Sequence, residues 1–474
     1  MKRPISYLSI FLPALAVLSH IQVLSAADTR SGVRHTIIAE SGAATPAGGH
    51  YSPFSFLNAR LNSQHAVAFD AQVIGPLITS GVFVGDGTAT STIALGVSAN
   101  PATPSFGSVL NPFITRNGAV LFTTGAGEIF RSDGRVIVPL VRIGDAAQGG
   151  GVVALLGNPV VNDGGAVAYF AGVSGGAVTQ AIFRTDGTRT TTIARDDIAP
   201  PTGGRFTSLE NLDMNNSGRV AFNSEMTGGS ADHGIFRGDG GYLTPVFVTH
   251  QAAPGGGTVE DCGAPQINAR GQVMAICLLM NSASPAGILV GDGSDAAAMA
   301  LIGTPAPNGG NYDFFTSMPR LNDSGEVAFQ ARLTGGTIGM FRSDGKRTTT
   351  LALSGTSAPG TTGTFQSFGD LFELGNDGRV AFAAKLAVGV GGVDSSNNIG
   401  IWIGTSNEDL RLVVRTGGVI GGKVLTGLPF DSSSVAGHPL QLNENSVLWR
   451  GSFGPAKVVV VSGFTDGDGG NEED

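Results

Sequence analysis

Short apolar segments alternate with turn-forming residues along almost the whole chain. The clearest segments run from Asn322 to Phe329 (Asn-Asp-Ser-Gly-Glu-Val-Ala-Phe) and from Asn215 to Phe222 (Asn-Asn-Ser-Gly-Arg-Val-Ala-Phe). Each joins a polar turn signal to a run of strand-forming residues. The successive starts lie 53, 47, 53, 53, 54, 53 and 68 residues apart, at Asn62, Thr115, Asn162, Asn215, Asn268, Asn322, Gly375 and Asn443. This nearly constant step indicates an internal repeat.

Two further signals advance with the same step. Asp-Gly pairs occur at positions 86–87, 133–134, 186–187, 239–240, 292–293 and 344–345. Prolines of Ala-Pro or similar pairs occur at positions 46, 101, 200, 254, 307 and 359. Because three independent signals keep the same spacing, one unit of about 50 residues is repeated through the chain.

Each unit is predicted to form four antiparallel strands, which we call A to D in chain order. In the unit at 314–359, strand A is expected at 315–321 and strand B at 326–333, joined by a type I turn from Asn322 to Gly325. Strand C is expected at 338–342, and strand D at 348–353, where a Thr-Thr-Thr run favours a strand. Asp344 and Gly345 are expected to form a two-residue hairpin turn with positive φ at both positions.

This arrangement predicts an all-β protein, a β-propeller of about eight four-stranded blades. The last unit, which begins at Asn443, has no strand D of its own. The first strand of the chain, from His35 to Ala39, resembles a strand D and is predicted to complete the last blade. Such a closure covers an edge that would otherwise be exposed. Seven blades remain the alternative, if the copy at Asn443 only caps the ring.

The composition agrees with a turn-rich β protein. The 474 residues include 73 Gly and 23 Pro, and only 14% are charged, whereas exposed helix faces are usually filled with charged residues. The net charge is −9 and no run of Lys or Arg forms a basic stripe, so nucleic acid is not expected as a partner. The presence of only two cysteines excludes a Cys-rich zinc site.

The N-terminus has the features of a secretory signal peptide. Lys2 and Arg3 precede an apolar stretch at 5–24, and Ser25 and Ala27 supply small residues before a cleavage site at Asp28. A membrane anchor is the less favoured alternative, because polar residues interrupt the apolar stretch. We therefore expect a signal peptide at 1–27, a single propeller domain at 28–463 and an acidic, disordered tail at 464–474. We expect a monomer exported to the periplasm or the extracellular space, with no stable membrane span after cleavage.

The Asn-x-x-Gly-x-Val-Ala-Phe repeat behind a signal peptide resembles a family of bacterial exported tandem-repeat proteins that carry this motif. The resemblance covers residues 35–463 and implies an exported, propeller-like protein without an established activity. Members often end in a surface-sorting segment with an apolar helix and a basic tail. This chain ends instead in an acidic, polar segment from Thr465 to Asp474, which favours release over anchoring.

The repeated motif residues are expected to have structural roles. Asn and Gly set the A–B turn, Asp and Gly set the C–D turn, and Val and Phe pack between blades. Each C–D turn offers one Asp, whereas a calcium loop needs several carboxylates, so a turn role is favoured over calcium binding. No two histidines have metal-ligand spacing, and neither a phosphate-binding loop nor a nucleophile elbow occurs. We expect no metal and no cofactor, with calcium on the Asp-Gly turns as the alternative.

Cys262 and Cys277 lie on either side of the A–B turn at 268–271. A two-residue loop would place the two cysteines opposite each other, whereas a bulged three-residue loop would put their side chains on opposite faces. An exported protein favours a disulfide, and two small buried thiols are the alternative. The sequence leaves both open.

The loops that join strand D to strand A and strand B to strand C vary in length and content. Because recognition usually lies in variable loops on a rigid scaffold, the ligand-binding residues are expected there, at His50, Tyr51, Arg205, Asp232, His233, Asp261, Asn311 and Tyr312. The predicted function is that of a secreted, non-catalytic binding or scaffold protein, whose partner is a carbohydrate or a surface protein. An exported carbohydrate-active hydrolase or lyase is the alternative. Enzymatic activity is therefore left open, with a non-enzyme favoured and no catalytic residue assigned.

Overall fold

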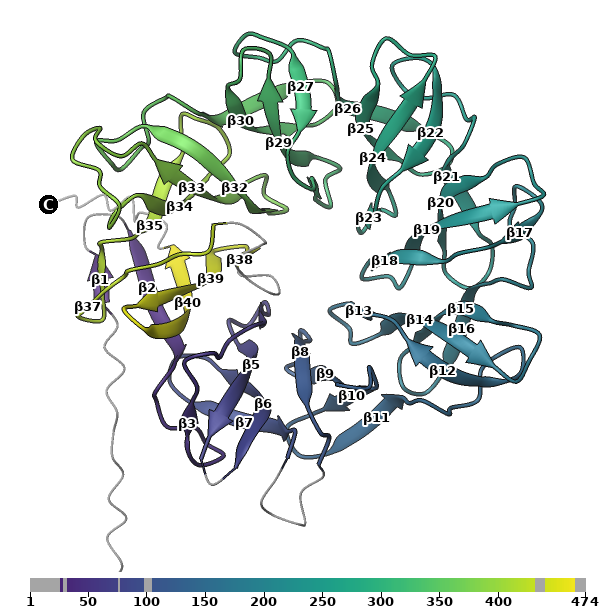
Figure 1. The fold of residues 1–474 in the computed structure, drawn as a ribbon, viewed down its shortest axis with the longest axis horizontal. Helices are drawn as coiled ribbons and strands as arrows, with labels where there is room; N and C mark the ends of the chain where they lie inside the picture. Colours follow the sequence, from purple (N-terminus) through teal and green to yellow (C-terminus); the bar gives the residue numbers. More distant parts are fainter. Residues whose placement is uncertain (1–25, 29–31, 76, 98–104, 431–439, 465–474) are drawn as a thin grey trace, which may run out of the picture.

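Eight antiparallel β-sheets are arranged in a ring in the computed structural model of the protein (Figure 1). The structure describes residues 26–28, 32–75, 77–97, 105–430 and 440–464, and all regular elements of this part are strands. Each sheet is one blade with the strand order A, B, C, D. The prediction of a β-propeller is confirmed, with eight blades rather than seven.

The first four blades follow the chain in order from residue 50. Their strands are, in blade 1, β3 (His50–Tyr51), β4 (Ala59–Leu61), β5 (Val67–Ile74), β6 (Ile78–Gly85) and β7 (Thr90–Leu95); in blade 2, β8 (Val109–Ile114), β9 (Val120–Thr124), β10 (Ile129–Ser132) and β11 (Ile137–Val141); in blade 3, β12 (Val152–Leu156), β13 (Val160–Val161), β14 (Val167–Ser174), β15 (Gln180–Thr185) and β16 (Thr190–Arg195); and in blade 4, β17 (Arg205–Phe206), β18 (Glu210–Met214), β19 (Val220–Thr227), β20 (His233–Gly238) and β21 (Thr244–Val248).

The other four blades complete the circle, and the last takes two strands from the N-terminus. Their strands are, in blade 5, β22 (Thr258–Cys262), β23 (Gln266–Ile267), β24 (Val273–Met280), β25 (Ala286–Gly291) and β26 (Ala296–Leu301); in blade 6, β27 (Tyr312–Phe315), β28 (Arg320–Leu321), β29 (Val327–Leu333), β30 (Ile338–Ser343) and β31 (Thr348–Leu353); in blade 7, β32 (Phe365–Leu374), β33 (Val380–Leu386), β34 (Ile399–Gly404) and β35 (Arg411–Arg415); and in blade 8, β38 (Leu440–Asn443), β39 (Ser446–Phe453), β40 (Ala456–Phe464), β2 (Val33–Glu40) and β1 (Ala26–Asp28). A small hairpin of β36 (Val419–Ile420) and β37 (Lys423–Val424) precedes blade 8.

Strand A is broken into two segments in five of the blades. The prediction of one continuous strand at 315–321 is therefore wrong, because β27 ends at Phe315 and β28 begins at Arg320. Pro319 lacks an N–H for the ladder, and the backbone N–H of Thr316 bonds the carbonyl of Gln330 on strand B. The second segments, such as β13, β18 and β23, lie at the inner rim of the ring, and the first segments lie farther out (Figure 1).

The Val-Ala-Phe motif packs both faces of strand B against neighbouring blades. In blade 6, Val327 and Phe329 belong to a core shared with blade 5, whereas Ala328 belongs to a core shared with blade 7. All three side chains are fully buried. Phe329 also stacks on Phe341 of strand C, with 5.4 Å between the ring centroids. Burying such an aromatic side chain stabilises a fold by about 1.5–3 kcal/mol, so the repeated motif contributes to the core between each pair of blades.

The asparagine that begins each A–B turn also links one blade to the next. The Oδ1 of Asn215 accepts the backbone N–H of Arg219 within its own turn, at 2.9 Å. Its Nδ2 donates to the backbone carbonyl of Asn268 in the next turn, at 2.8 Å. The same inter-blade bond joins Asn62 to Thr115, Asn162 to Asn215, Asn268 to Asn322, Asn322 to Gly375 and Asn443 to Asn62. We call this circle of bonded turns the turn girdle.

The two turns without a leading asparagine are linked by arginine residues instead. After Thr115, the backbone N–H of Arg116 donates to the carbonyl of Asp163 in the next turn, at 3.0 Å. After Gly375, the guanidinium of Arg379 donates to the carbonyl of Glu444. The turn girdle therefore passes through all eight blades.

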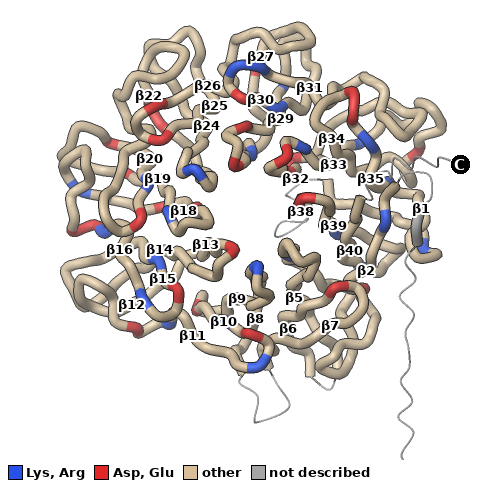
Figure 2. The backbone as a smooth tube through the Cα atoms, turned by 180° about the vertical axis from the view of Figure 1, so that it is seen from behind, with Lys and Arg blue, Asp and Glu red and all other residues tan. Residues whose placement is uncertain are grey.

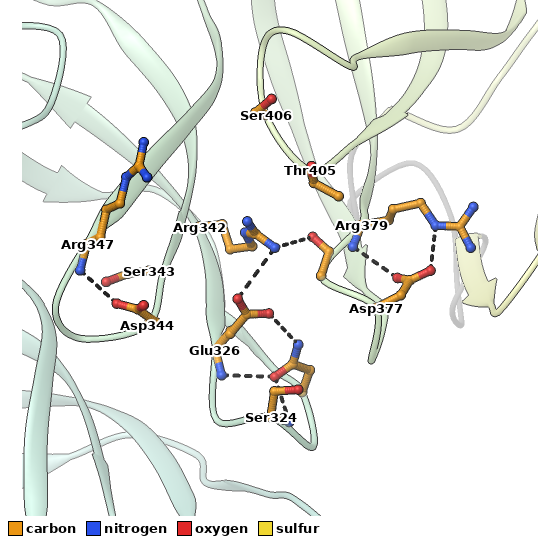
Figure 3. Close-up of polar contacts among 12 residues, drawn as sticks. Ser324, Glu326, Arg342, Ser343, Asp344, Arg347, Asp377, Arg379, Thr405 and Ser406 are labelled. Carbon is orange, nitrogen blue, oxygen red and sulfur yellow. Dashed lines mark hydrogen bonds and ion pairs between the residues drawn. The ribbon is translucent and has the colours of Figure 1, made fainter.

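The C–D turns differ from the predicted two-residue hairpin. In blade 6, four residues separate the paired Ser343 and Thr348. Gly345 has a φ of +82°, but Asp344 is not among the residues with positive φ. The Oδ1 of Asp344 accepts the backbone N–H groups of Lys346 and Arg347, at 2.8 and 2.7 Å. Figure 3 shows the bond from Arg347. The aspartate closes this turn with its carboxylate, so the predicted primed geometry is wrong.

The N-terminal strand closes the ring, as predicted. β2 pairs antiparallel with β40 over the whole length from Val33, opposite Phe464, to Glu40, opposite Val458. Nδ1 of His35 on β2 lies 2.8 Å from the Ser462 hydroxyl on β40. β40 ends at Phe464, and the rest of the predicted tail lies outside the described residues, as does the predicted signal peptide up to residue 25.

Candidate functional site

Two of the predicted ligand-binding residues belong to the aromatic core. Tyr51 is 3% exposed and contacts the rings of Phe56, Phe69 and Phe83 in blade 1. Tyr312 occupies the same kind of position in blade 6 and is also 3% exposed. Burial raises the pKa of both phenols, that of Tyr312 to about 12. As placed, neither ring is open to a ligand.

The other predicted residues lie at the surface but are spread over several blades. His233 is half-buried at the start of β20, and the remaining five are exposed: His50, Arg205, Asp232, Asp261 and Asn311. These six residues belong to blades 1, 4, 5 and 6. The structure therefore does not bring the predicted set together into one site.

Cys262 and Cys277 form a disulfide in the structure. They are directly opposite each other on β22 and β24, with 4.1 Å between their Cα atoms. A shift in register between Val259 and Asp261 sets this pairing. The bridge is buried in the core that blades 4 and 5 share.

Arg205 lies in a polar groove between blades 3 and 4. The groove has a volume of about 590 Å³, and its lining includes Thr179 and Gln180 of blade 3, Asp196 and Asp197 of the following loop, and Arg205 at the start of blade 4. This volume falls in the range of small-molecule sites. The groove is formed by a B–C loop and a D–A loop, which are the loop types predicted to carry recognition.

The polar groups that line this groove are mostly paired with each other. Asp196 accepts the backbone N–H of Thr179 at 3.1 Å. Asp197 forms two parallel 2.8 Å bonds with the guanidinium of Arg195. Gln180 donates to the carbonyl of Thr207 at 2.8 Å. Arg205 differs, because its guanidinium has no hydrogen bond or ion pair to any residue that the structure describes.

A second group of charged side chains, absent from the sequence prediction, lies on strands A and B of blades 1, 6, 7 and 8. We call Arg60, Asp70, Arg320, Glu373 and Arg450 the inner-rim cluster, and they come from β4, β5, β28, β32 and β39 in blades 1, 6, 7 and 8. Figure 2 shows acidic and basic segments around the inner rim of the ring. The cluster therefore joins the two ends of the ring by charge as well as by strand pairing.

Burial shifts the pKa values of four residues of this cluster. It raises the pKa of Asp70, while hydrogen bonds from the side chain and backbone of Asn58 act in the opposite direction. It also raises the pKa of Glu373, against which the charges of Arg320 and Arg60 act. Burial lowers the pKa of Arg60 and of Arg450 to about 10. Groups with such shifted pKa values concentrate at functional sites, although structural ion-pair networks also produce them.

Charged side chains also bridge blades 6 and 7 at two places. At the junction of blades 6 and 7, the Glu326 carboxylate bonds Asn322 at 3.0 Å and pairs with Arg342 at 3.4 Å (Figure 3). Arg342 donates to the carbonyl of Gly378 in the next turn, at 3.0 Å. Nearer the kink in strand A, Arg320 of blade 6 lies 3.5 Å from the Glu373 carboxylate of blade 7.

A signal for the inner-rim cluster does exist in the sequence. The residue two positions before each A–B turn is Phe113 or Val160 in two units but is ionisable in four, at Arg60, Asp213, Arg320 and Glu373. Aligning the units on their turns would have shown that these charges share one register. The sequence alone does not show that this register faces the inner rim.

In the part of the chain that the structure describes, no three His, Cys, Asp or Glu side chains are grouped to hold a metal ion. Within the same ranges, no helix combines the length and apolar character of a membrane span.

The sequence profile of a family of unknown function (DUF7453) matches residues 25–282 and 129–432. The chain belongs to this family. Together the two matches cover seven of the eight blades and the N-terminal strands β1 and β2 of the last one. No curated protein is significantly similar to the chain.

Solved structures similar to the chain are β-propellers of low sequence identity. The propeller domain of the Trilobed protease from Pyrococcus furiosus is 9% identical, with a TM-score of 0.38, over 76% of this chain and 97% of that one. The C-terminal WD40 domain of Sif2 is 11% identical, with a TM-score of 0.43, over 90% of this chain and 97% of that one. The WD40 domain of SCAP from fission yeast is 9% identical, with a TM-score of 0.41, over 92% of this chain and 99% of that one. These likenesses concern the fold alone.

Proposed function

We propose that this protein is a secreted, non-catalytic binding protein that recognises an acidic polysaccharide through the groove between blades 3 and 4. The expected export rests on the signal-peptide features of residues 1–27. The propeller acts as the scaffold, because the turn girdle and the strand closure hold the blades and leave the D–A and B–C loops to carry recognition. Membership of the family adds no activity to this proposal.

The unpaired guanidinium of Arg205 is the observation that carries the proposal. The carboxylates beside it are already engaged by Thr179 and Arg195, so Arg205 is the one cation on this groove that is open to a partner among the described residues. A guanidinium binds a carboxylate or sulfate group with two parallel hydrogen bonds. The side-chain oxygens of Thr179 and Gln180, across the groove on blade 3, remain acceptors for the hydroxyl groups of a sugar chain, while their donors are engaged by Asp196 and Thr207.

The test compares the binding of polygalacturonate with that of dextran, a neutral polysaccharide, by biolayer interferometry. We expect polygalacturonate alone to bind, and Arg205→Ala to weaken the binding about tenfold, which corresponds to the loss of one charged contact of about 1.4 kcal/mol. The matched control is Arg135→Ala, which removes an exposed arginine from a C–D turn of blade 2 and should bind as the wild type does.

Three results would overturn the proposal. They are no binding of polygalacturonate, equal binding of dextran, or equal binding by the Arg205→Ala variant. The release of new reducing or unsaturated ends from the polysaccharide during the same incubation would instead indicate the hydrolase or lyase alternative.

A further inference from the structure

In three blades, the side chain two positions before the A–B turn ties the inner segment of strand A to the next blade. Asp213 of blade 4 accepts the backbone N–H of Ile267 in blade 5, at 2.7 Å. Gln266 of blade 5 donates to the carbonyl of Pro319 in blade 6, at 2.9 Å. Gln441 of blade 8 accepts the backbone N–H of Leu61 in blade 1, at 2.8 Å. Each of these side chains has a polar partner in the following blade.

Arg60 is the residue two positions before the A–B turn of blade 1, and it has no such polar partner among the described residues of the next blade. Its guanidinium carbon lies 5.3 Å from the centre of the Phe113 ring in blade 2. No residue that the structure describes forms a hydrogen bond or an ion pair with its side chain. Its Nη1 is buried, while the side chain as a whole is half-buried. Arg60 therefore presents five N–H donors at the inner rim with none of them paired.

The neighbours of Arg60 are committed to other partners. Asp70 accepts three N–H groups, from the backbone and side chain of Asn58 at 2.8 and 2.6 Å and from the backbone of Asn111 at 3.3 Å. Arg450 donates to the carbonyls of Phe56 and Leu57. Glu373 is paired with Arg320. The charges of Asp70 and Glu373 act on Arg60 only over a distance.

A guanidinium in this state is costly, because it has lost part of its hydration without gaining hydrogen bonds. An oxyanion would supply the missing acceptors, since its oxygens match the planar fork of an arginine. The pKa of Arg60 is lowered to about 10, so the group is still charged at neutral pH. The aromatic face of Phe113 holds the guanidinium plane without using its donors.

We propose that Arg60 is the anchor of an oxyanion-binding site on the inner rim where blades 8, 1 and 2 meet. The site takes the carboxylate, sulfate or phosphate group of a small ligand. It lies in other blades than the groove at Arg205, so it is independent of the polysaccharide site proposed above.

The test measures thermal unfolding of the mature protein in sulfate, phosphate and galacturonate against sodium chloride of equal ionic strength. We expect at least one oxyanion to raise the melting temperature by about 2–5 °C, because a ligand that binds only the folded state stabilises it. The three salts distinguish the sources of the oxyanion, since sulfate and phosphate mimic ester groups and galacturonate carries the carboxylate of an acidic sugar.

Two variants localise the effect. Arg60→Met keeps an unbranched stem over Phe113 but has no donors, and it is expected to abolish the oxyanion-dependent rise. In chloride it should melt at or above the wild-type temperature, because an unpaired, desolvated charge has been removed. Arg60→Lys keeps the charge without the planar fork and should weaken the oxyanion affinity at least about tenfold. The control Arg135→Met should show the wild-type rise.

The proposal is overturned if no oxyanion raises the melting temperature above that in chloride. It is also overturned if Arg60→Met or Arg60→Lys retains the full rise. Should Arg60→Met fail to fold, the result with Arg60→Lys decides. If Arg205→Ala loses polysaccharide binding but keeps the rise in melting temperature with oxyanions, the two sites are separate. Each proposal can therefore fail without the other.

Discussion

At the scale of single residues, the aspartates of the C–D turns act through their charge. Burial does not explain them, since Asp186 and Asp292 lie at exposed turns. Asp186 accepts bonds from the hydroxyl and backbone of Thr188 and from the backbone of Arg189, which lower its pKa to about 2. Asp292 accepts equivalent bonds from Asp295 and Ser294, which also lower its pKa to about 2. The bonds to these carboxylates stabilise the turns most while the carboxylates are ionised.

The first prediction is that these turns contribute to the acid sensitivity of the fold. A folded-state pKa below the unfolded value of about 3.9 means that the stability gain is present above pH 4 and is lost as the pH falls toward 2. Asp292→Asn keeps an oxygen acceptor but cannot titrate, so the free energy of unfolding should fall less steeply between pH 4 and 2. The slope of the free energy of unfolding against pH should differ between the two proteins by the equivalent of at most about one bound proton per molecule.

Urea unfolding followed by circular dichroism at a series of pH values checks this prediction. Ser294→Ala removes one of the bonds to Asp292 and should change the slope in the same direction by a smaller amount. An identical pH dependence in the wild type and in Asp292→Asn would show that the turn carboxylate does not act in this way.

At the scale of elements, the A–B turn is both a local structure and a joint between blades. The glycine at its fourth position, such as Gly218 with a φ of +80°, makes the turn possible. The asparagine at its first position uses its oxygen within the turn and its nitrogen on the next blade. A turn aspartate would keep the first role and lose the second, which explains why the side chain here is an amide.

The second prediction concerns this joint. Asn215→Ala should lower the free energy of unfolding by about 1–3 kcal/mol, because the carbonyl of Asn268 and the N–H of Arg219 lose a buried partner. The matched control is Asn216→Ala, which removes an exposed pair with Asp163 and should cost less than about 1 kcal/mol. Denaturant unfolding measures both, and equal losses would contradict a special role for the buried asparagine.

At the scale of the whole molecule, one strand from the N-terminus turns a row of blades into a ring. β2 lies between β40 and β1 in blade 8, and the Lys423 ammonium is 2.6 Å from the Glu40 carboxylate at the end of this strand. The hydroxyl of Ser462 lies against both His35 of β2 and Trp449 of β39. Without β2, the outer edge of β40 would be exposed.

The third prediction is that removal of residues 1–40 abolishes cooperative unfolding and leads to self-association through the free edge of β40. A chain that starts at Asp28 retains β2 and is the control, which should remain monomeric and unfold in one transition. Size-exclusion chromatography and thermal unfolding distinguish the two. A peptide of residues 33–40 added to the shortened chain should partly restore its melting temperature. A shortened chain that is monomeric and equally stable would contradict the closure.

Most of the fold could be predicted from the spacing of the repeats. Strand D of blade 6 lies at Thr348–Leu353, where the Thr-rich run placed it, and strands B and C differ from their predicted ranges by one residue at one end. Strand A could not be predicted as well, because between the pairs Phe315–Ala331 and Arg320–Ala328 four of its residues stand against two of strand B. The C–D turn was misjudged because an aspartate side chain replaces the primed backbone geometry.

The candidate sites were harder to predict. Tyr51 and Tyr312 are polar aromatic residues next to loops, a position that does not reveal whether the ring turns toward the core or the solvent. Arg205 and Asp196 are nine residues apart, and the groove between them forms only when blade 4 packs on blade 3. The inner-rim cluster combines residues as far apart as Arg60 and Arg450, which only the closed ring brings together.

The sequence by itself determined the repeated unit and the closing strand, and it favoured eight blades over seven, which the structure confirmed. These depend on local turn chemistry and on an apolar alternation of period two, both of which repeat often enough to be recognised. Only the tertiary structure decided which side chains share a groove, which asparagine nitrogens reach the next blade, and which arginine is left without a partner. Such contacts join residues about 50 or nearly 400 positions apart, and their geometry is set by the packing of blades rather than by any short segment.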